Sequence, residues 1–242
     1  METKKITSTL LAAGIVVSSV PAYAYESSEA DLSTTELLSV IDEEDSFASS
    51  VAVTGQTDTS ISIKWSTNDS HKSYSVSVNG IVVADSIDDD IYNITGLQSA
   101  NEYYISVNAY DEEGTLLISS DEICAHTNLT LSSNFTLTND IKAANVYVDS
   151  GTLNLNGHTL TVSGDTWVRS GYLKINKGKL YTGGNLNLCA SDKSRSTSYL
   201  TMENDEDYVC VNGNMHVRSY YNYSTLTAGI LEIKGDFTQK TG

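Results

Sequence analysis

Charged residues that could take part in acid–base chemistry recur at a fixed spacing in the second half of the chain. Asp149 and Arg169 lie twenty positions apart, and Cys189 and Arg218 continue the series. An Asp beside an Arg can act as a general base with a charge partner, or it can form a surface ion pair that contributes less than about 1 kcal/mol. We favour the ion pair, because hydrolysis of a glycosidic bond needs two carboxyl groups close together and no second acid occurs in this series.

Aromatic and polar side chains recur at the same spacing, two positions earlier. This series consists of Tyr147, Trp167, Asn187 and His216. Exposed aromatic faces beside polar groups are suited to stacking on sugar rings. Tyr147, Trp167 and His216 are therefore a candidate glycan-contact surface. The alternative is that these aromatic rings only cover the edges of the fold.

Other motifs in the chain give no sign of a catalytic or metal centre. The acidic turn at 203–207 could hold calcium through its carboxylates, but it lacks the regular spacing of a calcium loop, so a solvated loop is the better interpretation. His71, His126 and His158 are scattered, and the sequence has no G-x-S-x-G, HExxH or phosphate-binding glycine loop. We expect no catalytic residue, no metal ligand and no cofactor, and we expect that the protein is not an enzyme.

A repeat of about twenty residues must position both series. The stretch GTLNLNGHTLTVSGD from Gly151 is followed from Gly171 by GYLKINKGKLYTGGN. Each repeat contains three short L-x-L strands, and a unit of this size buries a core only when units stack. Three strands per turn predict a short parallel β-helix, or solenoid, over 128–242. An antiparallel sandwich is the alternative, although it does not explain the fixed offset.

Strand alternation predicts which residues of the repeat face inward. One buried ladder consists of Val148, Val168 and Leu188, followed by Val217. A second ladder contains Val146, Thr166, Leu186, Met215 and Phe237. Two corner features accompany these ladders. Glycine stands at 164, 184, 213 and 235, either because φ is positive or because side chains would collide there, and Asn156 and Asn176 predict an asparagine corner.

The segment 51–127 has a different pattern of short alternating runs separated by turn residues. This pattern predicts about seven antiparallel strands in a β-sandwich. The dipeptide Asn79-Gly80 lies between two such runs and predicts a tight hairpin, since both residues tolerate positive φ. The fold class predicted for the whole chain is therefore all-β, with an antiparallel sandwich followed by a parallel solenoid.

One string in this segment carries a family resemblance. LQSANEYYISVNAYD, which begins at Leu97, resembles the second half of a fibronectin type III domain. The resemblance implies that Trp65 and Tyr74 are buried in the sandwich. It also implies that Tyr103 forms a tyrosine corner, with its hydroxyl returning to the backbone near Leu97. The prolines that are usual in this family are absent. The later repeats resemble segments of large secreted proteins of gut bacteria.

The first fifty residues indicate export. Residues 1–24 combine Lys4 and Lys5, an apolar run and Ala22-Tyr23-Ala24, which predicts a bacterial signal peptide cleaved after Ala24, with an uncleaved anchor as the alternative. The Ser-rich acidic stretch 25–50 predicts a disordered linker. The net charge of −17 argues against binding to nucleic acid. With three cysteines, either one disulfide and one free thiol or three free thiols are possible.

These features together predict a non-enzymatic bacterial surface or secreted protein without a membrane span after signal cleavage. It would act as a spacer or scaffold in adhesion or glycan interaction, with a polysaccharide or another cell-surface protein as its partner. The alternative is a non-catalytic module of a larger carbohydrate-active enzyme. The repeat reaches Gly242 without a polar cap, so we expect either that it continues in a longer protein or that it docks end-on.

Overall fold

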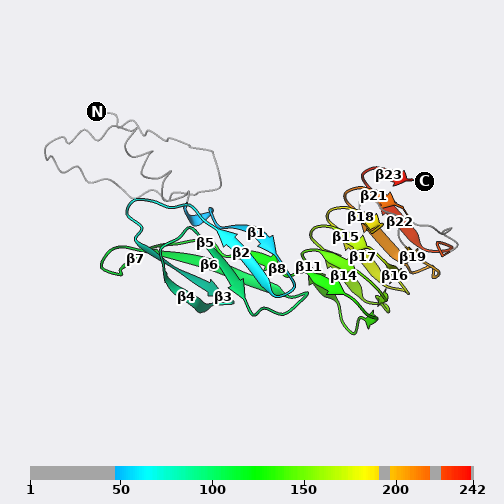
Figure 1. The fold of residues 1–242 in the computed structure, drawn as a ribbon, viewed down its shortest axis with the longest axis horizontal. Helices are drawn as coiled ribbons and strands as arrows, with labels where there is room; N and C mark the ends of the chain where they lie inside the picture. The colour runs from blue at the N-terminus through cyan, green and yellow to red at the C-terminus, as the bar shows by residue number, and fades with distance from the viewer. Residues whose placement is uncertain (1–46, 191–196, 219–224, 241–242) are drawn as a thin grey trace, which may run out of the picture.

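The structure is a computed structural model that describes residues 47–190, 197–218 and 225–240. In this part of the chain an antiparallel β-sandwich precedes a parallel β-solenoid (Figure 1). The predicted all-β fold class is confirmed. The predicted signal peptide, 1–24, and most of the predicted linker, 25–46, lie outside the described residues. No helix in the described part of the chain is long and apolar enough to cross a membrane.

The sandwich consists of two antiparallel sheets. One sheet has the order β1-β2-β5, and the other has the order β4-β3-β6-β7, with β8 also paired to β6. The strands are β1 (Ala52–Gln56), β2 (Ser60–Lys64), β3 (Ser73–Val78), β4 (Ile81–Ile87), β5 (Ile91–Thr95), β6 (Glu102–Tyr110), β7 (Leu116–Ser119) and β8 (Ile123–His126). The turn between β3 and β4 is the expected tight hairpin, because Asn79 and Gly80 both have positive φ, at 51° and 75°.

The sandwich core contains the large side chains that alternation places inward. Trp65 and Tyr74 are each 2% exposed, and their ring centroids lie 5.3 Å apart. Tyr103 is buried, and its hydroxyl accepts a hydrogen bond of 2.7 Å from the backbone N–H of Gln98. Leu97, beside this contact, is partly buried against the same core. The Tyr103 hydroxyl thus ties β6 to the preceding loop.

The sandwich begins earlier than the sequence predicted. Phe47 was placed in the disordered linker, but it is 2% exposed and stacks on Tyr74 at 6.1 Å. The carbonyl of Ala48 accepts a hydrogen bond from the N–H of Asp121. The linker prediction is therefore wrong for 47–50. A single large aromatic side chain in an otherwise polar stretch buries enough surface to join the core.

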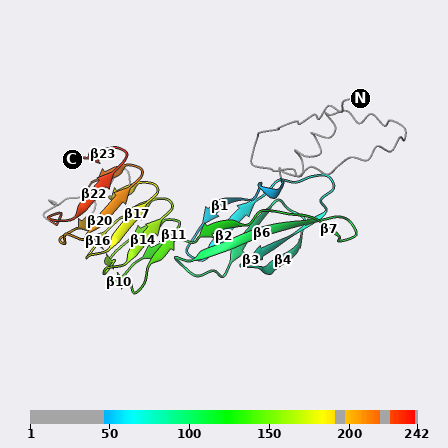
Figure 2. The same ribbon diagram turned by 180° about the vertical axis from the view of Figure 1, so that it is seen from behind.

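The solenoid consists of three parallel sheets, and each of its first four coils contributes one strand to each sheet (Figures 1 and 2). The first solenoid sheet contains β9 (Leu129–Leu131), β12 (Val146–Val148), β15 (Thr166–Val168), β18 (Leu186–Leu188), β21 (Met215–Val217) and β23 (Phe237–Gln239). The second contains β10 (Phe135–Thr136), β13 (Thr152–Asn154), β16 (Gly171–Lys174) and β19 (Ser198–Thr201). The third contains β11 (Ile141–Ala143), β14 (Thr159–Val162), β17 (Lys179–Thr182), β20 (Tyr208–Val211) and β22 (Ile230–Ile233).

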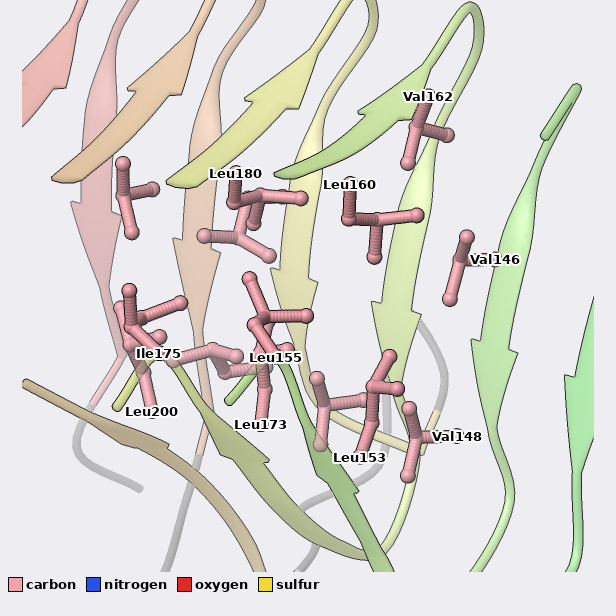
Figure 3. Packing of buried hydrophobic residues seen from close by; sticks show 14 of the residues in the cluster. Val146, Val148, Leu153, Leu155, Leu160, Val162, Leu173, Ile175, Leu180 and Leu200 are labelled. Carbon is pink, nitrogen blue, oxygen red and sulfur yellow. The ribbon is translucent and has the colours of Figure 1, made fainter. Parts of the chain in front are cut away.

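Aliphatic side chains from all three sheets fill the interior of the solenoid. Figure 3 shows Val148, Leu153 and Leu160 pointing into the space that the sheets enclose, and each is fully buried. Val148 pairs with Val168, and Val168 pairs with Leu188, so the offset of twenty is the true register. Both partners are also fully buried. The parallel arrangement is confirmed, and the antiparallel alternative is excluded for this segment.

The last strand departs from the predicted ladder. Phe237 is in register with Met215 as expected, but it is 56% exposed. β23 stands at the end of the sheet order, where no described strand lies beyond it. Register and burial are therefore separate properties, because a ladder residue becomes buried only when coils cover it on both sides.

The corner between the third and first solenoid sheets carries both a glycine column and a polar ladder. The four stacked glycines do not have positive φ; instead a Cβ at Gly184 would lie 2.9 Å from the Gly164 carbonyl carbon. In the ladder, the side-chain Oδ1 of each member but the last accepts the backbone N–H of the equivalent residue in the next coil, at 2.7–2.9 Å. Its members are Asn145, Asp165, Asn185, Asn214 and Asp236. The predicted asparagine corner is a different one. Asn156 and Asn176 have positive φ values there, of 51° and 47°.

Hydrogen bonds join the two units directly. Asn128 lies between β8 and β9 and is 7% exposed. Its side-chain amide donates to the carbonyl of Gln56 at 2.8 Å, and its backbone N–H donates to the carbonyl of Thr57 at 2.9 Å. At the same junction Lys142 of β11 forms an ion pair with Glu102 of β6 at 2.7 Å. The solenoid is therefore held against the sandwich by specific polar contacts.

Candidate functional site

An open groove of about 490 Å³ lies on the outward face of the first solenoid sheet. Parallel pairing places Trp167 of β15 beside Asn187 of β18, and Asn187 beside His216 of β21. Neighbouring strands are about 4.8 Å apart, so these three side chains form a continuous row across the sheet. Strand alternation turns these side chains outward, and the stacking of the repeats places them side by side. Three distant parts of the sequence thus form one surface.

Asn187 forms the floor of the groove and has an unusual environment. It is 2% exposed although it belongs to the outward series. Its side-chain nitrogen has no hydrogen-bond partner among the described residues. A buried amide donor without a partner costs about 1–3 kcal/mol. Such a donor beside a half-buried indole can instead be satisfied by an oxygen atom of a bound molecule.

Basic side chains line one end of the groove. Arg218 and Lys240 belong to its walls, together with Asp165. Of the described residues that line the groove, only Asp165 carries a carboxylate, and its Oδ1 accepts the N–H of Asn185 in the polar ladder. The lining therefore combines an aromatic ring, neutral donors and positive charge within a strongly acidic protein.

The third residue of the candidate glycan surface lies beside the groove rather than in it. Tyr147 pairs with Trp167 in the sheet, but the guanidinium carbon of Arg169 lies 4.6 Å above the centroid of its ring. Arg169 also pairs with Asp149 at 3.0 Å, and both side chains are 41% exposed. One face of the Tyr147 ring is therefore covered. Arg169 thus forms both the expected surface ion pair with Asp149 and a cation–π contact with Tyr147.

The acidic turn has a structural explanation. Asp207 is 1% exposed, and its carboxylate accepts backbone N–H groups from Lys177 at 2.5 Å, Glu203 at 2.7 Å and Asn204 at 3.1 Å. The solvated-loop interpretation is wrong for Asp207, whereas Glu203, Asp205 and Glu206 are exposed as that interpretation expects. The carboxylate is enclosed because it organises the turn and links it to the preceding coil.

The cysteines are placed as follows. Cys124 is exposed, whereas Cys189 and Cys210 are buried. Cys124 and Cys210 are free thiols, so the single disulfide that the sequence left open is not formed. Cys189 lines the groove next to Asn187. The fold is therefore stabilised by its two apolar cores and its hydrogen bonds.

A second aromatic row lies on another sheet and has a different geometry. Tyr172 of β16 stacks on Tyr199 of β19 with ring centroids 4.6 Å apart and planes inclined by 10°. The two stacked rings cover each other's inner faces. The first solenoid sheet therefore offers the better binding site, since Trp167 there lies in a hollow with polar neighbours.

The sequence identified Trp167 and His216 as site residues, and the structure brings them together in the groove. It did not identify Asn187 as part of the site, although this residue stood in the same series. Lys240 was also missed. The signal for both was the repeat, since Asn187 follows Trp167 by twenty residues and Lys240 follows Arg218 by twenty-two, whereas the burial of Asn187 depends on the neighbouring coils.

Comparison with known proteins recognises the two halves of the chain differently. The model of the fibronectin type III domain matches residues 48–124, and no curated protein matches. A fibronectin type III-like protein from Clostridium thermocellum is 20% identical over 32% of this chain and 91% of that one, with a TM-score of 0.28.

Two solved enzymes also align with the chain. The family 28 exopolygalacturonase of Yersinia enterocolitica is 14% identical over 70% of this chain and 41% of that one, with a TM-score of 0.32. A pectate lyase of Erwinia chrysanthemi, in complex with tetragalacturonic acid, is 10% identical over 76% and 90%, with a TM-score of 0.28. With the strand pairing described above, the first comparison confirms the resemblance: residues 48–124 are a fibronectin type III domain, and a parallel β-solenoid follows it.

Proposed function

We propose that the protein is a non-catalytic bacterial surface or secreted protein that binds a polysaccharide in the groove of the first solenoid sheet. The fibronectin type III domain acts as a spacer that presents the solenoid. Export is supported by the signal-peptide pattern of residues 1–24. The observation that carries the binding function is Asn187, whose buried amide nitrogen is unpartnered among the described residues and lies beside Trp167.

The groove has the chemistry of a sugar site. Sugar rings present apolar faces that stack on an indole, and hydroxyl groups that accept hydrogen bonds from an amide. Trp167, Asn187 and His216 offer these contacts in one row along the solenoid axis. A row of this kind suits an extended chain of sugars better than a compact ligand, because the groove is open along the sheet.

The charged residues near the groove support binding without catalysis. Asp165 is engaged in the polar ladder, and Asp149 is paired with Arg169. Acid–base hydrolysis of a glycosidic bond requires two carboxyl groups that flank the bond. The described lining contains one.

The test is retention of polysaccharides by the purified chain, measured by affinity electrophoresis and calorimetry against neutral and uronic-acid polymers. We expect binding to at least one polymer, and a loss of about tenfold or more for Trp167→Ala, which corresponds to about 1.4 kcal/mol of binding free energy. The matched control is Tyr181→Ala, because Tyr181 is an exposed aromatic residue on the third solenoid sheet. Circular dichroism checks that both variants fold.

Two results would contradict the proposal. One is equal retention of every polymer by the wild type and Trp167→Ala. The other is release of new reducing ends or unsaturated products from a bound polymer, which would assign the chain to the carbohydrate-active enzymes instead.

A further inference from the structure

Three side chains with metal-binding atoms meet on the outer face of the fibronectin type III domain, at its junction with the solenoid. β6 and β8 are antiparallel, and their register places Glu102 opposite His126 and Tyr104 opposite Cys124. Ala125, between the two β8 residues, points into the core and is 4% exposed. Cys124 and His126 therefore share the face of the sheet on which Glu102 lies.

The ligand atoms of Glu102, Cys124 and His126 all lie within 4.8 Å of one another. The Nε2 atom of His126 is 3.1 Å from Oε2 of Glu102. A tetrahedral zinc ion with bonds of about 2.0–2.3 Å separates its ligand atoms by about 3.3–3.8 Å. Small rotations of the three side chains would bring all of them to bonding distance of one ion.

The surroundings favour a bound cation. The Glu102 carboxylate accepts hydrogen bonds from Lys142 at 2.7 Å and from Tyr104 at 2.9 Å, so it already holds a cationic partner. The His126 and Glu102 side chains are 15% and 27% exposed, which leaves the site sheltered but open to an ion from solvent. Three protein ligands leave a fourth position for water, as in zinc sites that are open to a ligand.

We propose that Glu102, Cys124 and His126 bind a single divalent transition-metal ion of the zinc class. A thiolate and an imidazole select such ions over magnesium and calcium, which prefer oxygen ligands. The proposal is independent of the glycan groove, which lies on another unit.

Lys142 is the competitor for this ion. Its Nζ atom lies 2.7 Å from Oε2 of Glu102, the same oxygen that faces His126. The lysine side chain is 57% exposed and can turn into solvent at little cost. Metal binding therefore exchanges an ion pair between the two units for a site within the fibronectin type III domain.

The experiment is a cobalt titration of the metal-free, reduced chain, followed by the thiolate-to-cobalt charge-transfer absorption. We expect one equivalent of Co²⁺ to bind, to resist excess Mg²⁺ and to be displaced by Zn²⁺. Removal of a partner that only orients a ligand lowers metal affinity by about 10–100-fold, so His126→Gln and Glu102→Gln should lose at least tenfold. Cys124→Ser should abolish the absorption. Lys142→Gln should tighten binding.

The matched control is His158→Gln. His158 also lies beside a carboxylate, 3.5 Å from Asp140, but no cysteine completes that pair. Its loss should leave the titration unchanged. The metal binds the thiolate and must displace the thiol proton of Cys124, so affinity should rise with pH. Absence of the charge-transfer band, several equivalents displaced by Mg²⁺, or weaker binding in Lys142→Gln would overturn the proposal.

Discussion

Replacement of Asn187 by leucine should make the protein more stable and less able to bind. The side chain is 2% exposed and its amide nitrogen has no partner among the described residues. A buried donor left unsatisfied costs about 1–3 kcal/mol, and leucine fills a similar volume without a donor. We therefore expect Asn187→Leu to raise the free energy of unfolding by about 1–3 kcal/mol. The melting temperature should rise by about 2–4 °C for each kcal/mol in a chain of this size.

The same substitution two residues earlier should have the opposite sign. The Oδ1 atom of Asn185 accepts the backbone N–H of Asn214 at 2.8 Å. Asn185→Leu removes this acceptor and leaves the partly buried N–H of Asn214 without its side-chain partner, which should cost about 1 kcal/mol. Both variants carry the same change from asparagine to leucine on the same coil, so each serves as the control for the other.

The assay uses the two tryptophans of the chain, of which one lies in each unit. In a Trp65→Phe background, the fluorescence of Trp167 reports the unfolding of the solenoid in urea, and calorimetry supplies the melting temperature. Polysaccharide retention is measured on the same samples. A loss of stability of more than about 1 kcal/mol in Asn187→Leu would refute the reasoning, since it would mean that the amide donor is already satisfied.

Three further predictions concern the cores and one half-buried tyrosine. Val168→Asp places a charge in a fully buried ladder and should prevent folding of the solenoid, seen as loss of its circular dichroism and cooperative transition, because burial of an unpaired charge exceeds typical domain stability. Trp65→Ala should cost the fibronectin type III domain about 3–5 kcal/mol in urea unfolding, and a cost below 1 kcal/mol would contradict its core position. A hydrogen bond to Glu232 raises the pKa of Tyr208 to about 12, so its contribution to stability should be complete below pH 10 and fade as the pH rises towards 12; the difference in ultraviolet absorbance between wild type and Tyr208→Phe measures that titration.

The sequence was sufficient to predict the solenoid because the spacing of the repeats determines which strands pair and in which register. Repeats offset by twenty residues place Val148, Val168 and Leu188 in one ladder, and the structure has this pairing. Phe237 shows where the pattern stops being informative. Its register follows from the repeat, but its exposure depends on what covers the last described coil.

Features that depend on close packing or on distant pairing were not predictable from the spacing. The burial of Asn187 results from its neighbours on adjacent coils, because alternation alone turns it outward. Phe47 was missed because the composition of a long polar stretch conceals a single anchoring residue. The Glu102, Cys124 and His126 cluster arises only from the antiparallel register of β6 and β8, which brings together residues more than twenty positions apart.

The polar ladder also determines where this solenoid can change in evolution. At the ladder corner, the connection from the third to the first sheet has two residues between β11 and β12 and three residues in every later described coil, and the bond from Oδ1 to N–H is kept throughout. The next corner is not so constrained: β15 ends at Val168 and β16 begins at Gly171, whereas β18 ends at Leu188 and β19 begins only at Ser198. The longer connection at this second corner leaves the stacking intact, because β19 still pairs with β16 and β21 with β18. This solenoid can therefore gain residues at one corner without losing its register, while duplication of whole coils lengthens the stack.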